Sequence, residues 1–161
     1  VQRLGSYRSE WASSAKDLLV ANAPVSELIL YRYAFFKNPR LNTQILDTLN
    51  AFDSPRFPRA ALAFAELLGV DQESKSKTLR LMSKSLNKEP SLGPDMLAFI
   101  TGPWGAEIPL EEKLRFMQKS CGALRQTTPQ AMEQAAQWAS ESQSFWSQLL
   151  SQEVVACLKG R

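Results

Sequence analysis

The chain has 161 residues, of which 44% are hydrophobic and 22% are charged, and its formal net charge is +3. This length supports a hydrophobic core without disulfides or metals, and this composition excludes wholesale disorder. The longest apolar stretch, about ten residues, is interrupted by Arg32 and is too short to cross a bilayer, so we predict no membrane span. From this length we expect a single all-helical domain over residues 1–161. Because the first residue is Val1, we also expect this domain to belong to a longer or processed chain.

Proline placement predicts where most helices begin. Proline is tolerated in the first turn of a helix and breaks a helix further along. Six prolines each precede a stretch with helical periodicity: Pro24, Pro39, Pro58, Pro94, Pro109 and Pro129. We therefore predict an all-α protein, either a compact irregular helical bundle or a short helical-repeat-like array of about seven to eight helices.

The N-terminal part predicts two helices. The first runs from Ser6 to about Ala21 and is followed by the aromatic stretch Ser26–Phe36. On a helix, the apolar side chains of this stretch surround the axis, with only Glu27 and Arg32 as breaks, which is typical of a buried central helix. Its aromatic and β-branched content would also suit a strand, and that alternative stays open.

Two shorter helices are predicted next. Between Pro39 and Phe52, apolar residues recur every three or four positions, which indicates one buried stripe. After the turn at 53–58, a narrow stripe from Ala61 to Leu68 predicts a closely packed helix that stops at Gly69.

The helix expected from Asp71 to Lys88 separates charge from apolar side chains. Leu79, Met82 and Leu86 share one face, and the opposite face carries four cations: Lys77, Arg80, Lys84 and Lys88. Arg40, Arg56 and Arg59 could extend this basic face. A solvated lysine face is the commoner explanation, and a surface for nucleic acid or another acidic partner is the functional one.

The remaining chain predicts a short helix at 94–101, a turn that holds Trp104, and two long helices. The helix after Pro109 has one stripe: Leu110, Leu114, Met117, Cys121 and Leu124. The segment from Pro129 to Leu158 has two stripes. The first contains Met132, Ala136, Ala139, Trp146, Leu150, Val154 and Cys157, and the second contains Trp138, Phe145 and Leu149. Both are interrupted at Ser142 and Gln143, where we expect a kink or a break.

Recognisable catalytic chemistry is scarce. The chain has no histidine, which removes the commonest general base and the usual nucleophile pairs. Ser-x-x-Lys spacings occur three times without the partner motifs of a Ser/Lys dyad, and glycine-rich phosphate loops are absent from the sequence. Cys121 and Cys157 form neither a CxxC motif nor a zinc set. We therefore expect a protein that is not an enzyme and needs no cofactor or metal.

These features favour an interaction module that binds another protein through an aromatic and aliphatic helical surface. The candidate residues are Trp138, Phe145 and Leu149, which we expect to be at least partly exposed, with Trp104 and Phe116 beside them. The alternative, that these side chains pack within the core, stays open. The cysteine usage favours a reducing, intracellular compartment, either cytoplasmic or nuclear, and export by a signal that composition does not reveal stays open.

Overall fold

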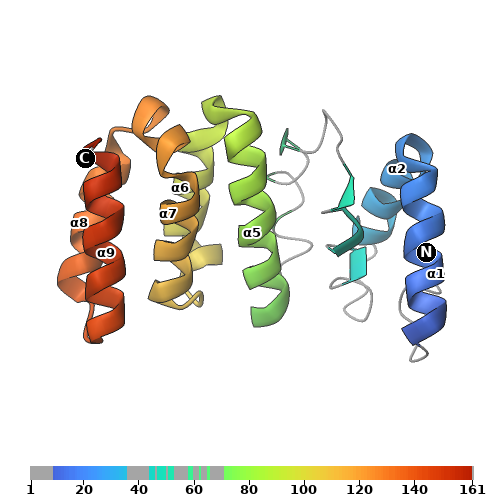
Figure 1. Ribbon diagram of the computed structural model, residues 1–161, viewed down its shortest axis with the longest axis horizontal. Helices are drawn as coiled ribbons and strands as arrows, with labels where there is room; N and C mark the ends of the chain where they lie inside the picture. The colour runs from blue at the N-terminus through green and yellow to red at the C-terminus, as the bar shows by residue number, and fades with distance from the viewer. Residues whose placement is uncertain are drawn as a thin grey trace. The chain divides into compact units, whose positions relative to one another are not determined.

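The computed structural model describes residues 9–35, 44, 45, 47–49, 51, 52, 58, 59, 62, 65 and 71–160. Within these residues the regular structure is helical and contains no strand (Figure 1). The predicted all-α fold class is therefore confirmed, and the strand alternative for the aromatic stretch is wrong. The chain divides into two compact units, Val1–Leu81 and Met82–Arg161, each described by itself below. The single-domain organisation stays a prediction.

The first unit begins with a helical hairpin. Helix α1 spans Ser9–Ala21 and α2 spans Ala23–Phe35, and the two helices pack against each other. They are separated by Asn22, whose side-chain amide donates a hydrogen bond to the Leu18 carbonyl over 2.9 Å. This bond satisfies one of the carbonyls that a helix leaves free at its C-terminal end.

The expectation that the aromatic stretch is buried on every side is wrong. In α2, Leu30 is fully buried, whereas Leu28 is 56% exposed and Ile29 is 40% exposed. The charged Glu27 is buried instead. Successive side chains on a helix point about 100° apart, so a helix packed mainly along one face leaves its other apolar side chains in solvent. Tyr31 and Tyr33 of the same stretch lie outside the side chains that the structure describes.

The two short helices predicted at 39–52 and 58–68 are described only in part. The described residues at 44, 45, 47–49, 51, 58, 59, 62 and 65 are all helical. Ile45, Leu49, Phe52 and Ala65 are buried, as the stripes predict. The other positions of these two segments, including Leu41, Ala61 and Leu68, lie outside the described residues.

Helix α5 spans Gln72–Lys88, and the boundary between the two units falls within it. Asp71 caps its N-terminus: its carboxylate accepts hydrogen bonds from the Ser74 backbone N–H over 2.9 Å and from the Ser74 hydroxyl over 2.8 Å. The backbone bond is the main reason why the pKa of Asp71 lies below its usual value. The apolar stripe of Leu79, Met82 and Leu86 is buried, as predicted.

The second unit is a stack of helices around α7. After the 3₁₀ turn η2 (Pro90–Leu92) come α6 (Gly93–Thr101), the 3₁₀ turn η3 (Pro103–Gly105), α7 (Leu110–Thr127), α8 (Gln130–Glu141) and α9 (Phe145–Leu158). Helix α7 packs against α6, α8 and α9, and a buried hydrogen bond from Ser120 to Ser83 joins it to the end of α5. The predicted stripe residues Leu114, Met117, Cys121 and Leu124 are buried. The interruption predicted at Ser142 is a complete break between α8 and α9.

A disulfide between Cys121 and Cys157 joins α7 to α9 across 36 residues of chain, with the two Cα atoms 6.2 Å apart. Three residues before Cys121, the Gln118 side-chain amide donates a 2.8 Å hydrogen bond to Glu153. The later residue of α7, Cys121, is linked to the later residue of α9, Cys157, and the earlier residue Gln118 to the earlier residue Glu153, so α7 and α9 run parallel. Helix α8, which joins them in the chain, runs in the opposite direction (Figure 1).

Candidate partner-binding surface

The start of α9 carries two adjacent exposed aromatic rings. Ser144 caps this helix by accepting a 3.1 Å hydrogen bond from the Ser147 backbone N–H, which places Phe145 and Trp146 in the first turn. Each ring is 70% exposed, and the two rings meet edge to face with their centroids 5.6 Å apart. The first turn of α9 follows the non-helical residues 142–144 and has few neighbours, so its side chains that point away from α8 reach solvent.

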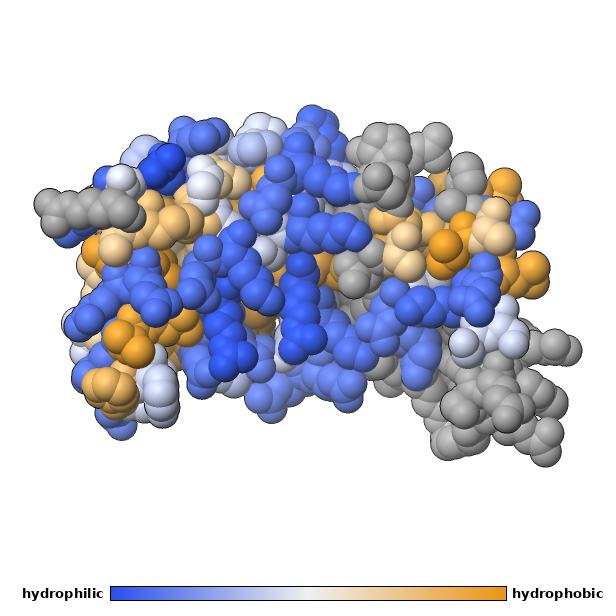
Figure 2. Space-filling view, viewed as in Figure 1, coloured by the Kyte–Doolittle hydropathy of each residue, from blue (hydrophilic) through white to orange (hydrophobic). Residues whose placement is uncertain are grey.

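These rings stand beside a groove of about 630 Å³ between α7 and α9, which we name the α7–α9 groove. Its α9 wall is largely apolar and consists of Trp146, Leu149, Leu150 and Glu153, and its α7 wall is polar and consists of Glu111, Arg115, Gln118 and Lys119. Leu149 is 39% exposed. In Figure 2 apolar side chains gather at the lower left, over the end of the second unit where α9 begins.

Two of the four charged side chains that line the groove pair with each other. Arg115 and Glu111 form an ion pair one helical turn apart, and Glu153 accepts the amide of Gln118. In the described part of the chain, Lys119 makes no ion pair, and only its backbone carbonyl is engaged, by the Asn87 amide. Lys119 and Glu153 therefore each lack an ion pair among the described residues, and the four formal charges of the groove sum to zero.

Two of the five candidate residues for the binding surface are buried, and the expectation that Trp138 is exposed is wrong. Trp138 is 5% exposed and Phe116 is 3% exposed. The Trp138 ring lies on the inner side of α8, with the Lys113 ammonium 5.6 Å from its centroid. Burial lowers the pKa of Lys113, an effect that the nearby Glu141 carboxylate partly opposes. Trp138 thus belongs to the core between α7 and α8.

Trp104 is partly exposed but does not line the α7–α9 groove. It packs on Phe99, with the ring centroids 4.7 Å apart, and follows the end of α6 in the turn η3. The next residue, Gly105, comes so close to the Ile100 carbonyl that a Cβ atom there would lie 1.7 Å from its oxygen. The turn therefore requires glycine at this position, and Trp104 serves to cover α6.

Phe145 and Leu149 remain as the predicted residues that lie together on the surface. Sequence reasoning missed Trp146 and Leu150, which it assigned to the other stripe. The signal that could have found Trp146 is its position as the second residue after the serine-rich break. Side chains in the first turn of a helix cannot all be covered by one neighbouring helix.

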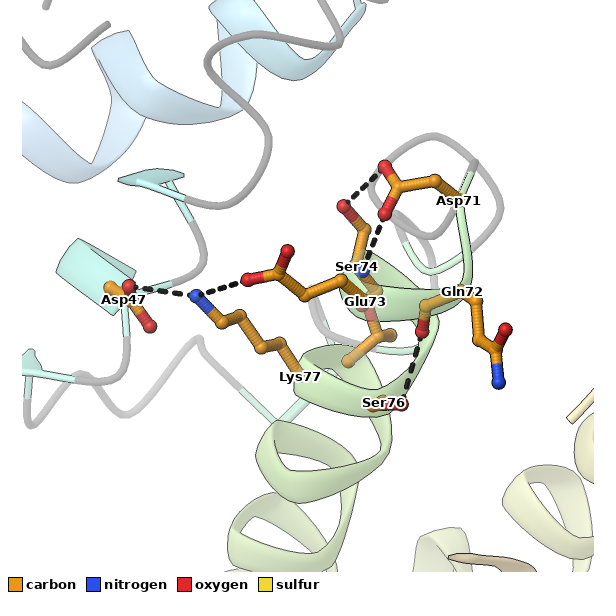
Figure 3. Close-up of polar contacts among 8 residues, drawn as sticks. Asp47, Asp71, Gln72, Glu73, Ser74, Ser76 and Lys77 are labelled. Atoms are coloured by element: carbon orange, nitrogen blue, oxygen red, sulfur yellow. Dashed lines mark hydrogen bonds and ion pairs between the residues drawn. The ribbon is translucent and has the colours of Figure 1, made fainter. Parts of the chain in front are cut away.

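The predicted basic face of α5 is partly neutralised. The Lys77 ammonium lies 3.1 Å from a carboxylate oxygen of Asp47 and 3.4 Å from one of Glu73, as Figure 3 shows. Arg80, Lys88 and Arg59 are exposed and Lys84 is half-buried. Arg40 and Arg56 lie outside the described residues. The two carboxylates beside Lys77 reduce the positive potential at this end of the face.

Comparisons with protein-family models, with curated proteins and with solved structures found no match. None of the helices in the described ranges combines the length and hydropathy that a membrane span needs. The described residues also contain no group of three or more side chains that could hold a metal ion.

Proposed function

We propose that this protein is a non-enzymatic interaction module that binds another protein through the start of α9 and the α7–α9 groove. The observation that carries the proposal is the pair of adjacent rings, Phe145 and Trp146, each 70% exposed beside a groove with an apolar wall. Aromatic residues are enriched among the residues that dominate binding energy at protein interfaces.

The size of these rings supports a binding role. An aromatic side chain buries roughly 200 Å², so covering the exposed 70% of one ring removes about 140 Å² from water and contributes about 3.5 kcal/mol at 25 cal/mol per Å². Two such rings offer about 7 kcal/mol before the costs of association are subtracted. In the isolated chain this apolar area stays in water and contributes no such free energy.

The alternative is a nucleic-acid-binding module that uses the basic face of α5. It is supported by the exposed Arg80 and Lys88 and opposed by the pairing of Lys77 with two carboxylates. This alternative predicts salt-sensitive binding to DNA or RNA that is lost when Arg80 and Lys84 are replaced by Glu. Absence of any retention on nucleic acid at low salt would dismiss it.

The test of the proposal is comparative capture with the intact chain. Crosslinked complexes from cell extract are identified for the wild type, for the double variant Phe145→Ser/Trp146→Ser, and for Leu18→Ser, a control that removes an equally exposed apolar side chain from α1. We expect a discrete protein partner that the double variant loses and the control retains, with unchanged circular dichroism. Equal capture by all three proteins would refute the assigned surface.

A further inference from the structure

The inner face of α9 offers little apolar surface to its neighbours. All 14 residues of this helix are described, and the buried ones are Ser147, Ser151, Val154 and Leu158. Two of these four side chains are apolar, whereas six of the seven buried residues of α7 are apolar. The partly buried apolar residues of α9 are Leu150, Val155 and Ala156. Because apolar burial is the main force that docks a helix, non-covalent packing holds α9 less firmly than it holds α7.

The buried serines of α9 do not attach it to α7 or α8. The Ser151 hydroxyl donates a 2.7 Å hydrogen bond to the Ser147 carbonyl, and the Ser144 hydroxyl donates one of 2.8 Å to the Ser147 hydroxyl. These bonds lie within one stretch of chain. The hydrogen bond from Gln118 to Glu153 does reach α7, but both side chains are exposed, so water competes for both groups.

The two ends of α9 are held in different ways. At its start, the non-helical residues 142–144 connect it to α8, with extended backbone at Ser142 and Ser144, and the Gln148 amide donates a 3.1 Å hydrogen bond to the Ser142 carbonyl. At its last turn, Cys157 is bonded to Cys121 of α7. If this bond is opened, the last turn loses its covalent link while the first turn stays connected, and α9 can move about residues 142–144.

We propose that the Cys121–Cys157 disulfide is a redox switch: its reduction releases α9 from α7, while α6, α7 and α8 stay folded. Local release of this kind is expected of the element with the least buried apolar surface. Since α9 forms one wall of the α7–α9 groove, release also separates the two walls.

External thiols reach the bond through Cys157, which is partly exposed, whereas Cys121 is 8% exposed. With a small dithiol, one thiolate attacks the Cys157 sulfur, the protein disulfide breaks, and Cys121 leaves as a thiolate that takes up a proton. The second thiolate then attacks the reagent's own sulfur in the mixed disulfide and releases Cys157, which takes up the second proton. Two electrons and two protons pass from the dithiol to the protein, and the reagent becomes a disulfide.

The test is hydrogen–deuterium exchange of the full chain, followed by mass spectrometry, with and without dithiothreitol. We expect the amides of residues 148–158 to exchange about tenfold faster or more after reduction, and those of 110–127 and 130–141 to stay within about twofold. The double variant Cys121→Ala/Cys157→Ala should match the reduced wild type without reductant, and dithiothreitol should not change it further.

Unchanged protection of α9 after reduction would mean that packing alone holds the helix, and an equal loss of protection in α6, α7, α8 and α9 would mean that the bond stabilises the whole unit. Either result would overturn this inference. The effect on the groove rests on the proposed function, but the exchange measurement needs no partner. Capture that is insensitive to Phe145→Ser/Trp146→Ser would therefore remove the assigned surface and leave the redox switch in place.

Discussion

The disulfide between Cys121 and Cys157 gives the sharpest prediction of stability. Reduction removes a crosslink that spans 36 residues. In the chain-entropy treatment, closing a loop of this length lowers the entropy of the unfolded chain by about 13 cal/mol/K, so reduction should lower the free energy of unfolding by about 3.8 kcal/mol at 25 °C. Such a loss is a large share of the 5–15 kcal/mol that is typical of folded domains.

The assay is urea denaturation of the full chain followed by far-UV circular dichroism, with and without a thiol reductant. The transition that involves the second unit should move to lower urea on reduction. The double variant Cys121→Ala/Cys157→Ala should unfold near the position of the reduced wild type, and reductant should not move it further.

Two results would refute this reasoning. A wild-type transition that reductant does not shift would mean that the crosslink does not restrict the unfolded chain, and alkylation of both thiols without prior reduction would mean that the bond is absent in solution. Because disulfides persist mainly in oxidising compartments, a bond found intact in cells would oppose the intracellular location expected from the sequence.

Three further substitutions have expected outcomes. Trp138→Ala should lower the free energy of unfolding by about 3–5 kcal/mol because its ring is buried, whereas Trp146→Ala should cost about 1 kcal/mol or less, as thermal unfolding would measure. Gly105→Ala should destabilise by about 1–3 kcal/mol or more because its Cβ meets the Ile100 carbonyl. Asp71→Ala should cost about 1 kcal/mol at neutral pH through loss of the helix cap.

Each of these predictions has its own control. A Trp146→Ala protein as unstable as Trp138→Ala would contradict the assignment of Trp138 to the core and of Trp146 to the surface. Gly122→Ala provides the matched glycine replacement, since a Cβ at Gly122 meets no atom within 4 Å and should be neutral or stabilising. For Asp71, the folded pKa lies below the unfolded value of 3.8, so its contribution is present above that pH and disappears as pH falls through the folded pKa. A difference between wild type and Asp71→Ala that grew on acidification would contradict the cap.

Periodicity and proline placement were enough to predict the helices and much of the core. The stripe of Leu114, Met117 and Leu124 in α7 follows directly from spacings of three and four, because a helix in contact with others must bury one face. The break at Ser142 was also visible, since both stripes of the segment failed there.

The sequence could not decide which of several apolar faces meets water. Leu28 lies in a stretch that is apolar on almost every side and Trp138 lies on a single apolar stripe, yet the first is exposed and the second is buried. The difference arises from the neighbouring helices, whose placement is a tertiary property. Pairing of Cys121 with Cys157 was missed for a similar reason: 36 residues separate them in the chain, and only the parallel course of α7 and α9 brings them together.

That parallel course also gives the α7–α9 groove a polarity. The dipoles of α7 and α9 point the same way, so their negative ends lie toward the side of the groove that holds Lys119 and Glu153. A helix added antiparallel to them, as α8 is, would set its own dipole against theirs.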